Sequence, residues 1–63
     1  MNANNLKKYR EKMGYSQSEL AKITKIPQTT ISGWEHGIGE PTYSRAILIA
    51  KKLNTPPEKI FGK

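Results

Sequence analysis

Four positions within residues 28–33 form a polar, uncharged face that could read the edges of DNA bases. Gln28 has an amide that can pair with both N6 and N7 of adenine, and Thr29 has a hydroxyl and a methyl group. Ser32 adds a hydroxyl one helical turn further on, and Gly33 removes bulk where another surface can approach. A solvated helix face normally carries Lys and Glu instead. The pattern predicts base recognition, and the alternative is a plain polar helix face.

Residues that could bind phosphate groups flank this segment. Phosphate contacts supply much of the affinity for DNA but carry no sequence information. His36 follows the expected end of a helix, where the dipole favours the protonated form, so it is either a phosphate contact or a plain helix-end residue. It is the single histidine, which leaves no residues for a metal site or for a catalytic base–nucleophile pair. The polar and basic candidates for phosphate binding are Thr30, His36, Tyr43, Ser44 and Arg45.

The composition of the chain also points to a polyanionic partner. Lys and Arg number 11 against 5 Glu, which gives a net charge of +6 at pH 7. Such an excess in a small domain indicates nucleic-acid binding, and the alternative is a solvated surface. There is no cysteine, so we expect no disulfide, no thiolate metal site and a cytoplasmic location. The longest apolar run, residues 46–50, is far shorter than the roughly 20 residues of a membrane span, so we expect no membrane partner.

Helical periodicity and end signals predict five helices in one all-α domain that covers residues 1–63, with a core at about 6–61. Ser16 and Glu19 predict a capping box for the second helix, and Thr55 and Glu58 predict another for the fifth. Pro27 suits the first turn of the third helix. No alternating strand pattern of useful length occurs. The expected helices cover about 5–13, 17–23, 27–35 and 43–53, and a short fifth helix follows Thr55, with a proline at its first position and with Ile60 and Phe61 in it.

Apolar residues at helical spacing predict the buried side of each helix. In the second helix either Ile23 or Thr24 completes the buried side with Leu20 and Ala21. The other expected inward positions are Leu6, Tyr9, Arg10 and Met13, then Ile31 and Trp34, then Ala46, Ile49, Ala50 and Leu53.

Apolar residues beside the buried side of the fourth helix form a further feature. Ile47 and Leu48 lie next to this side and not in it. With Ile60 and Phe61 they could form an exposed apolar patch, or they could simply complete a small core. The first interpretation favours a dimer interface made of these four residues.

Two short helices with about three residues between them, over residues 16–36, have helix-turn-helix spacing. The matching motifs are LKKYREKMGYSQSELA near the start, ISGWEHG at the end of the third helix, Pro41, and AKKLNTPPEKIF at the end. With these motifs in one register, the sequence resembles the lambda-repressor-like helix-turn-helix family, also called the Cro/repressor or xenobiotic-response-element type. The resemblance covers about residues 6–61.

The resemblance implies a compact five-helix DNA-binding domain whose third helix enters the major groove. It implies base reading by Gln28 and Thr29, and a position at Gly33 that has lost its base-reading side chain. It further implies that Gln17 holds a phosphate at the start of the second helix. Arg10 and Glu35 match a pair that joins the first and third helices by a salt bridge, which we assign to stability.

The family also implies a dimer formed through the fourth and fifth helices, which would bind a near-palindromic site. We therefore expect a sequence-specific regulator of transcription, acting as a repressor on its operator. With no room for an effector domain, it should bind no small-molecule ligand and no cofactor. The alternative is an antitoxin or another protein-interaction module of the same fold. Nothing in the sequence predicts an enzyme.

Two departures from the family pattern bear on the turn and on the third helix. Lys25 stands where the turn commonly has glycine, and a positive φ there would cost lysine about 1 kcal/mol. Pro27 replaces a common serine or threonine cap, so the third helix could begin one residue early and shift the direction of Gln28.

Overall fold

Five short helices make up residues 5–62, the part of the chain that the computed structural model describes. They are α1 (Leu6–Lys12), α2 (Gln17–Thr24), α3 (Gln28–Glu35), α4 (Tyr43–Lys52) and α5 (Pro57–Phe61). Over these residues there is no strand, so the prediction of an all-α fold is confirmed.

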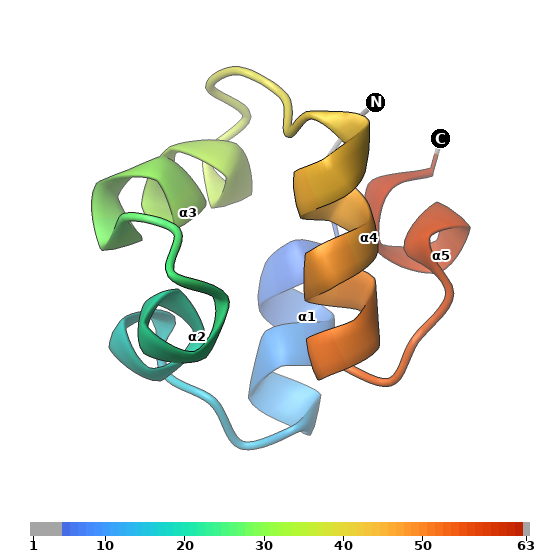
Figure 1. Cartoon of the computed structure of the whole chain (residues 1–63), viewed down its shortest axis with the longest axis horizontal. Helices are drawn as coiled ribbons and strands as arrows, with labels where there is room; N and C mark the ends of the chain where they lie inside the picture. Colours follow the sequence, from blue (N-terminus) through green and yellow to red (C-terminus); the bar gives the residue numbers. More distant parts are fainter. Residues whose placement is uncertain (1–4, 63) are drawn as a thin grey trace.

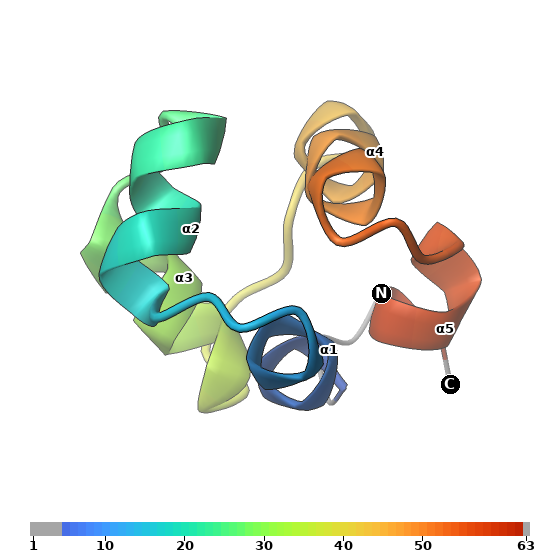
Figure 2. The ribbon, with the colours of Figure 1, turned by 90° about the horizontal axis from the view of Figure 1, so that it is seen from below.

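The helices form two groups with α1 between them (Figures 1 and 2). On one side α2 and α3 lie together, and on the other side α4 and α5 lie together, with α1 running across the gap. Contacts follow the same plan, because α1 touches both α3 and α5, and α2 touches both α3 and α4. Each short helix is therefore held by at least one helix that is distant in the sequence.

A single apolar cluster fills the space between the helices. Thr24, and not Ile23, completes the buried side of α2, since Thr24 is 4% exposed and Ile23 is 37% exposed. Met13 was expected to be inward, but it is 44% exposed because α1 ends at Lys12 and its buried face stops at Arg10. The cluster consists of Leu6, Leu20, Ile26, Ile31, Trp34, Ala46, Ile49, Ala50, Leu53, Ile60 and Phe61.

The ends of the helices explain where the chain turns. The capping box at the start of α2 is present: the hydroxyl of Ser16 accepts from the N–H of Glu19 at 3.0 Å, and Glu19 accepts from the N–H of Ser16 at 2.8 Å. The capping box predicted for α5 is wrong, because Pro56 is its N-cap and the hydroxyl of Thr55 donates to the carbonyl of Leu53 at 2.9 Å instead. Because α5 starts at Pro57, Thr55 lies one residue before the N-cap position that the capping box requires.

Candidate nucleic-acid interface

One face of α3 is fixed against the core and the other is exposed. Ile31 is fully buried and Trp34 is 5% exposed, so these two side chains set the rotation of the helix. On the outward side Gln28 and Thr29 are exposed, and Ser32 is half-buried on the same face one turn later. The helix begins at Gln28, one residue later than expected, with Pro27 as its N-cap.

The turn between α2 and α3 is three residues long and tightly held. The hydroxyl of Thr24 donates to the carbonyl of Leu20 at 2.7 Å and accepts from the N–H of Ile26 at 3.4 Å. Lys25 adopts the left-handed conformation, with φ of 58°, as the comparison with a glycine turn suggested. Ile26 is 3% exposed and anchors the turn in the core. The angle between α2 and α3 is therefore fixed by local hydrogen bonds and by one buried side chain.

A buried ion pair ties α1 to the end of α3. The Nε of Arg10 donates to Glu35 Oε2 at 2.7 Å, and its Nη2 donates to Oε1 at 3.1 Å. The remaining Nη1 donates to the carbonyl of Tyr15 at 2.8 Å. The side chains of Arg10 and Glu35 are only 8% and 2% exposed. This pair is the one that the family resemblance implied.

The same carboxylate also engages Gln17 at the start of α2. The side-chain amide of Gln17 donates to Glu35 Oε1 at 3.0 Å. Burial acts to raise the pKa of Glu35, but the hydrogen bonds from Arg10 and Gln17 outweigh it and hold the pKa below its ordinary value. The hydrogen bond to Glu35 raises the pKa of Arg10. The amide expected to hold a phosphate thus has a partner within the fold.

The start of α3 is better suited to a phosphate than the start of α2. Glu19 already places a carboxylate at the start of α2, and the N–H of Ser16 that it accepts lowers the pKa of this group. By contrast, α3 has no side-chain cap and no acidic residue in its first turn. Its first N–H groups and the positive end of its dipole therefore favour an anion. Thr30, half-buried, follows in the same turn.

A second group of phosphate candidates lies at the start of α4. Tyr43, Ser44 and Arg45 form its first exposed turn, and Tyr43 is 73% exposed. The loop over residues 36–42 joins this turn to the end of α3 (Figure 1). Thr42 caps α4 by accepting from the N–H of Arg45 at 3.3 Å. The first turn of α4 contains no acidic residue.

The end of α3 closes with a glycine in the left-handed conformation. Gly37 has φ of 79°, and the N–H of Ile38 donates back to the carbonyl of Gly33 at 2.7 Å. One residue earlier, Nδ1 of the exposed His36 lies 2.8 Å from the carbonyl oxygen of Ser32. Ile38 is 70% exposed beside the outward face, and the sequence prediction had not singled it out. Glycine followed by an apolar residue just past a helix end is the signal that could have placed it there.

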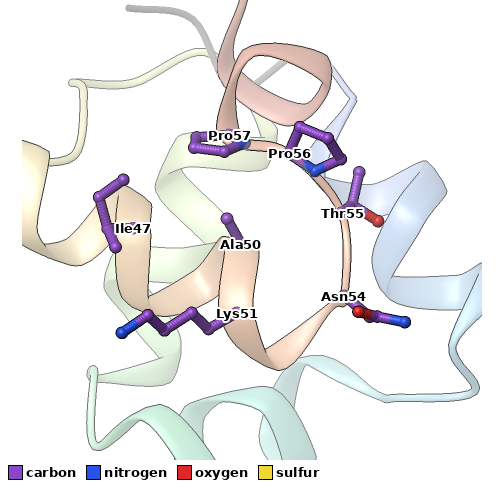
Figure 3. Close-up of a pocket in the computed structure, with 7 residues that line it drawn as sticks. All are labelled: Ile47, Ala50, Lys51, Asn54, Thr55, Pro56 and Pro57. Carbon is purple, nitrogen blue, oxygen red and sulfur yellow. The ribbon is translucent and has the colours of Figure 1, made fainter.

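The four residues of the predicted dimer patch differ in their burial. Ile60 and Phe61 are 0% and 1% exposed, so their assignment to an exposed patch is wrong. They are buried because α5 packs against both α1 and α4. Ile47 and Leu48 remain half-buried on α4. Beside Ile47 lies an open depression of about 460 Å³. The residues that line it, drawn in Figure 3, are Ile47, Ala50, Lys51, Asn54, Thr55, Pro56 and Pro57.

The described part of the chain has neither a metal-binding cluster nor a membrane-spanning helix. Residues 5–62 contain no group of three or more His, Cys, Asp or Glu side chains that could hold a metal ion. None of the helices in that range is long and apolar enough to cross a membrane.

Comparison with known proteins assigns the chain to a family. The sequence profile of a helix-turn-helix family matches residues 6–60. The chain is also similar to the HTH-type transcriptional regulator DicA of Escherichia coli (strain K12), with 39% identity over 57 residues that cover 87% of this chain and 42% of that protein. This chain therefore spans less than half the length of that relative.

The chain belongs to the helix-turn-helix family of the Cro/repressor type, and its five helices form the lambda-repressor-like fold. The similarity supports a role in DNA-binding regulation of transcription.

Proposed function

We propose that this chain binds specific sequences of double-stranded DNA with α3 in the major groove, and that it represses transcription by occupying its operator. The observation that carries the proposal is the outward face of α3. This face is polar and uncharged, while Ile31 and Trp34 lock the opposite face into the core. Gln28, Thr29 and Ser32 then read base edges, and a cytoplasmic location gives them access to DNA.

Phosphate contacts position α3 on the duplex in this proposal. The uncapped start of α3 and the first turn of α4 lack acidic residues, which favours phosphates at both places. The DNA backbone is contacted from α4 by Tyr43, Ser44 and Arg45. It is also contacted by Thr30 of α3 and by His36, the C-cap of α3. Gln17 is the weakest of the proposed phosphate contacts, because its amide already donates to Glu35.

The dimer is proposed to form through α4, around Ile47 and Leu48. The adjoining depression offers Pro56 and Pro57 as further apolar surface (Figure 3). The fold measures 25 × 22 × 19 Å, and α3 lies on the side away from α5 (Figure 2). Two copies joined near α4 would therefore hold their α3 helices apart by about one DNA turn, roughly 34 Å, on a near-palindromic operator.

The test is selection of bound duplexes from a random pool, followed by sequencing. Wild type should enrich a near-palindrome, and Gln28→Ala should relax the preference at one base pair per half-site at a cost of about 1–3 kcal/mol. Glu58→Gln, on the far side at α5, is the control and should enrich the same sequence. No enriched sequence with wild type would refute the proposal and favour a protein partner, as in an antitoxin.

A further inference from the structure

Ile38 is an exposed aliphatic side chain beside the polar face of α3. It is 70% exposed, against 44% for Met13 and 37% for Ile23. It comes three residues after α3 ends and takes no part in the apolar core. Single exposed apolar side chains are common on protein surfaces, so the observation that bears on function is the position of Ile38 beside the polar face of α3.

The position of Ile38 is fixed by a backbone hydrogen bond and by the turn at Gly37. Its N–H donates to the carbonyl of Gly33 at 2.7 Å, and Gly37 makes the necessary turn with φ of 79°. A Cβ placed on Gly33 would lie 3.8 Å from the Cβ of Ile38. Ile38 therefore stands next to the side chain that Gly33 lacks and extends the outward face of α3 at its far end.

Gly33 is not required by the packing of the chain itself. The added Cβ would meet Ile38 O at 3.6 Å and Ile38 Cβ at 3.8 Å, both ordinary contact distances. Gly33 also needs no positive φ, and alanine would improve the helix propensity of α3. The glycine thus leaves one side of Ile38 uncovered on the face that is proposed to meet DNA.

We propose that Ile38 reads the C5-methyl group of a thymine in the major groove. This inference rests on the proposed function, since it requires α3 to lie in that groove. The thymine methyl is the one apolar group that base pairs present there, and aliphatic contact is how proteins detect it. Gly33 lets the methyl reach the side of Ile38. Gln28 lies five residues before Gly33, about 7.5 Å along the helix, so Gln28 and Ile38 are expected to read different base pairs.

The experiment uses the duplex selected by wild type, with each thymine replaced in turn by deoxyuridine. This replacement removes only the methyl group. At one thymine per half-site, wild type should lose about fourfold in affinity, the effect expected for one buried methyl group. Ile38→Ala removes the contact from both half-sites of the proposed dimer, so it should lose about 16-fold or more on the thymine duplex. It should no longer distinguish deoxyuridine from thymine at that position. Ile23→Ala, the matched control on α2, should keep the wild-type discrimination.

Three outcomes would overturn the inference. If Ile38→Ala binds the thymine and the deoxyuridine duplex more weakly than wild type by the same factor, it still distinguishes the two bases, and Ile38 contacts the sugar–phosphate backbone instead. If Ile38→Ala binds both duplexes as tightly as wild type, Ile38 makes no contact. In both cases Gln28→Ala would still relax the sequence preference at the base pair that Gln28 reads, so the proposed function would stand. If wild type selects no sequence, the proposed function fails and the inference fails with it. Trp34 fluorescence during urea unfolding should show that Ile38→Ala keeps the wild-type stability.

Discussion

Replacing either partner of the Arg10–Glu35 ion pair should bring the domain close to unfolding. Glu35→Leu leaves the guanidinium of Arg10 buried without its carboxylate, and Arg10→Met leaves the carboxylate of Glu35 in the same situation. Breaking a buried pair by removing one partner costs about 3–5 kcal/mol. A domain of 63 residues has a total stability of roughly 3–9 kcal/mol. Each single variant should therefore be marginally folded or unfolded.

Removing both partners together should cost much less than the sum of the two single losses. The double variant Arg10→Met/Glu35→Leu buries no charge, and apolar side chains of similar size can replace such a pair at little cost. What remains is the amide of Gln17 and the carbonyl of Tyr15, each deprived of one hydrogen bond. Such losses cost about 1–3 kcal/mol when the group stays buried and less when water reaches it. The coupling energy should thus be at least about 2 kcal/mol.

The assay is urea unfolding of the four members of the cycle, followed by fluorescence and by circular dichroism. Trp34 is the single tryptophan and is 5% exposed, so its emission reports the loss of the core. Work at about 10–20 °C, near maximum stability, keeps the single variants measurable. If each single variant loses less than about 1 kcal/mol and the two losses add, the pair behaves as a surface salt bridge and the reasoning is refuted.

The structure also predicts how pH and four further substitutions change stability or self-association. The pKa of Glu35 lies below its ordinary value of 4.5, so the stability it contributes is complete above that value and is lost as the pH falls below it. Stability should therefore fall as the pH drops below about 4.5, and less steeply in the double variant Arg10→Met/Glu35→Leu, as urea midpoints would show. Lys25→Gly should raise stability by about 0.5–1 kcal/mol, because relief at φ of 58° exceeds the entropy cost of glycine. Lys22→Gly, inside α2, should lower it by about 1 kcal/mol, and equal effects of the two glycines in thermal melts would contradict this account. Gly33→Ala should add about 1 kcal/mol in the same melts, since its Cβ would make only ordinary contacts with Ile38 at 3.6 and 3.8 Å, and a loss would show crowding. Ile47→Ser should weaken self-association in sedimentation, and an unchanged association would move the dimer contact elsewhere.

The parts of the fold that follow from local signals could be predicted from the sequence. The start of α2 follows from Ser16 and Glu19, whose side chains cap it within one turn. The rotation of α3 follows from Ile31 and Trp34, since two apolar residues three apart define one side of a short helix. The candidate outward face of α3 could be deduced for the same reason.

The features of the fold that depend on distant contacts could not be predicted from local patterns in the sequence. The five residues of α5 are too few to show a period, and both Ile60 and Phe61 are buried because α1 and α4 cover them. The carbonyls of Lys59 and Ile60 also accept from Asn5, 54 and 55 positions away. The hydrogen bond between Gln17 and Glu35 is of the same kind, since no local pattern links the two residues.

The central claim is that α3 is the surface that meets DNA. It is tested most directly by titrating the labelled protein with its selected duplex and following backbone amide signals by NMR. The account predicts that the largest changes map to residues 28–33, with smaller changes at the first turn of α4, and that a scrambled duplex moves the α3 signals less. Changes confined to α1 or α5, or equal changes with both duplexes, would contradict it.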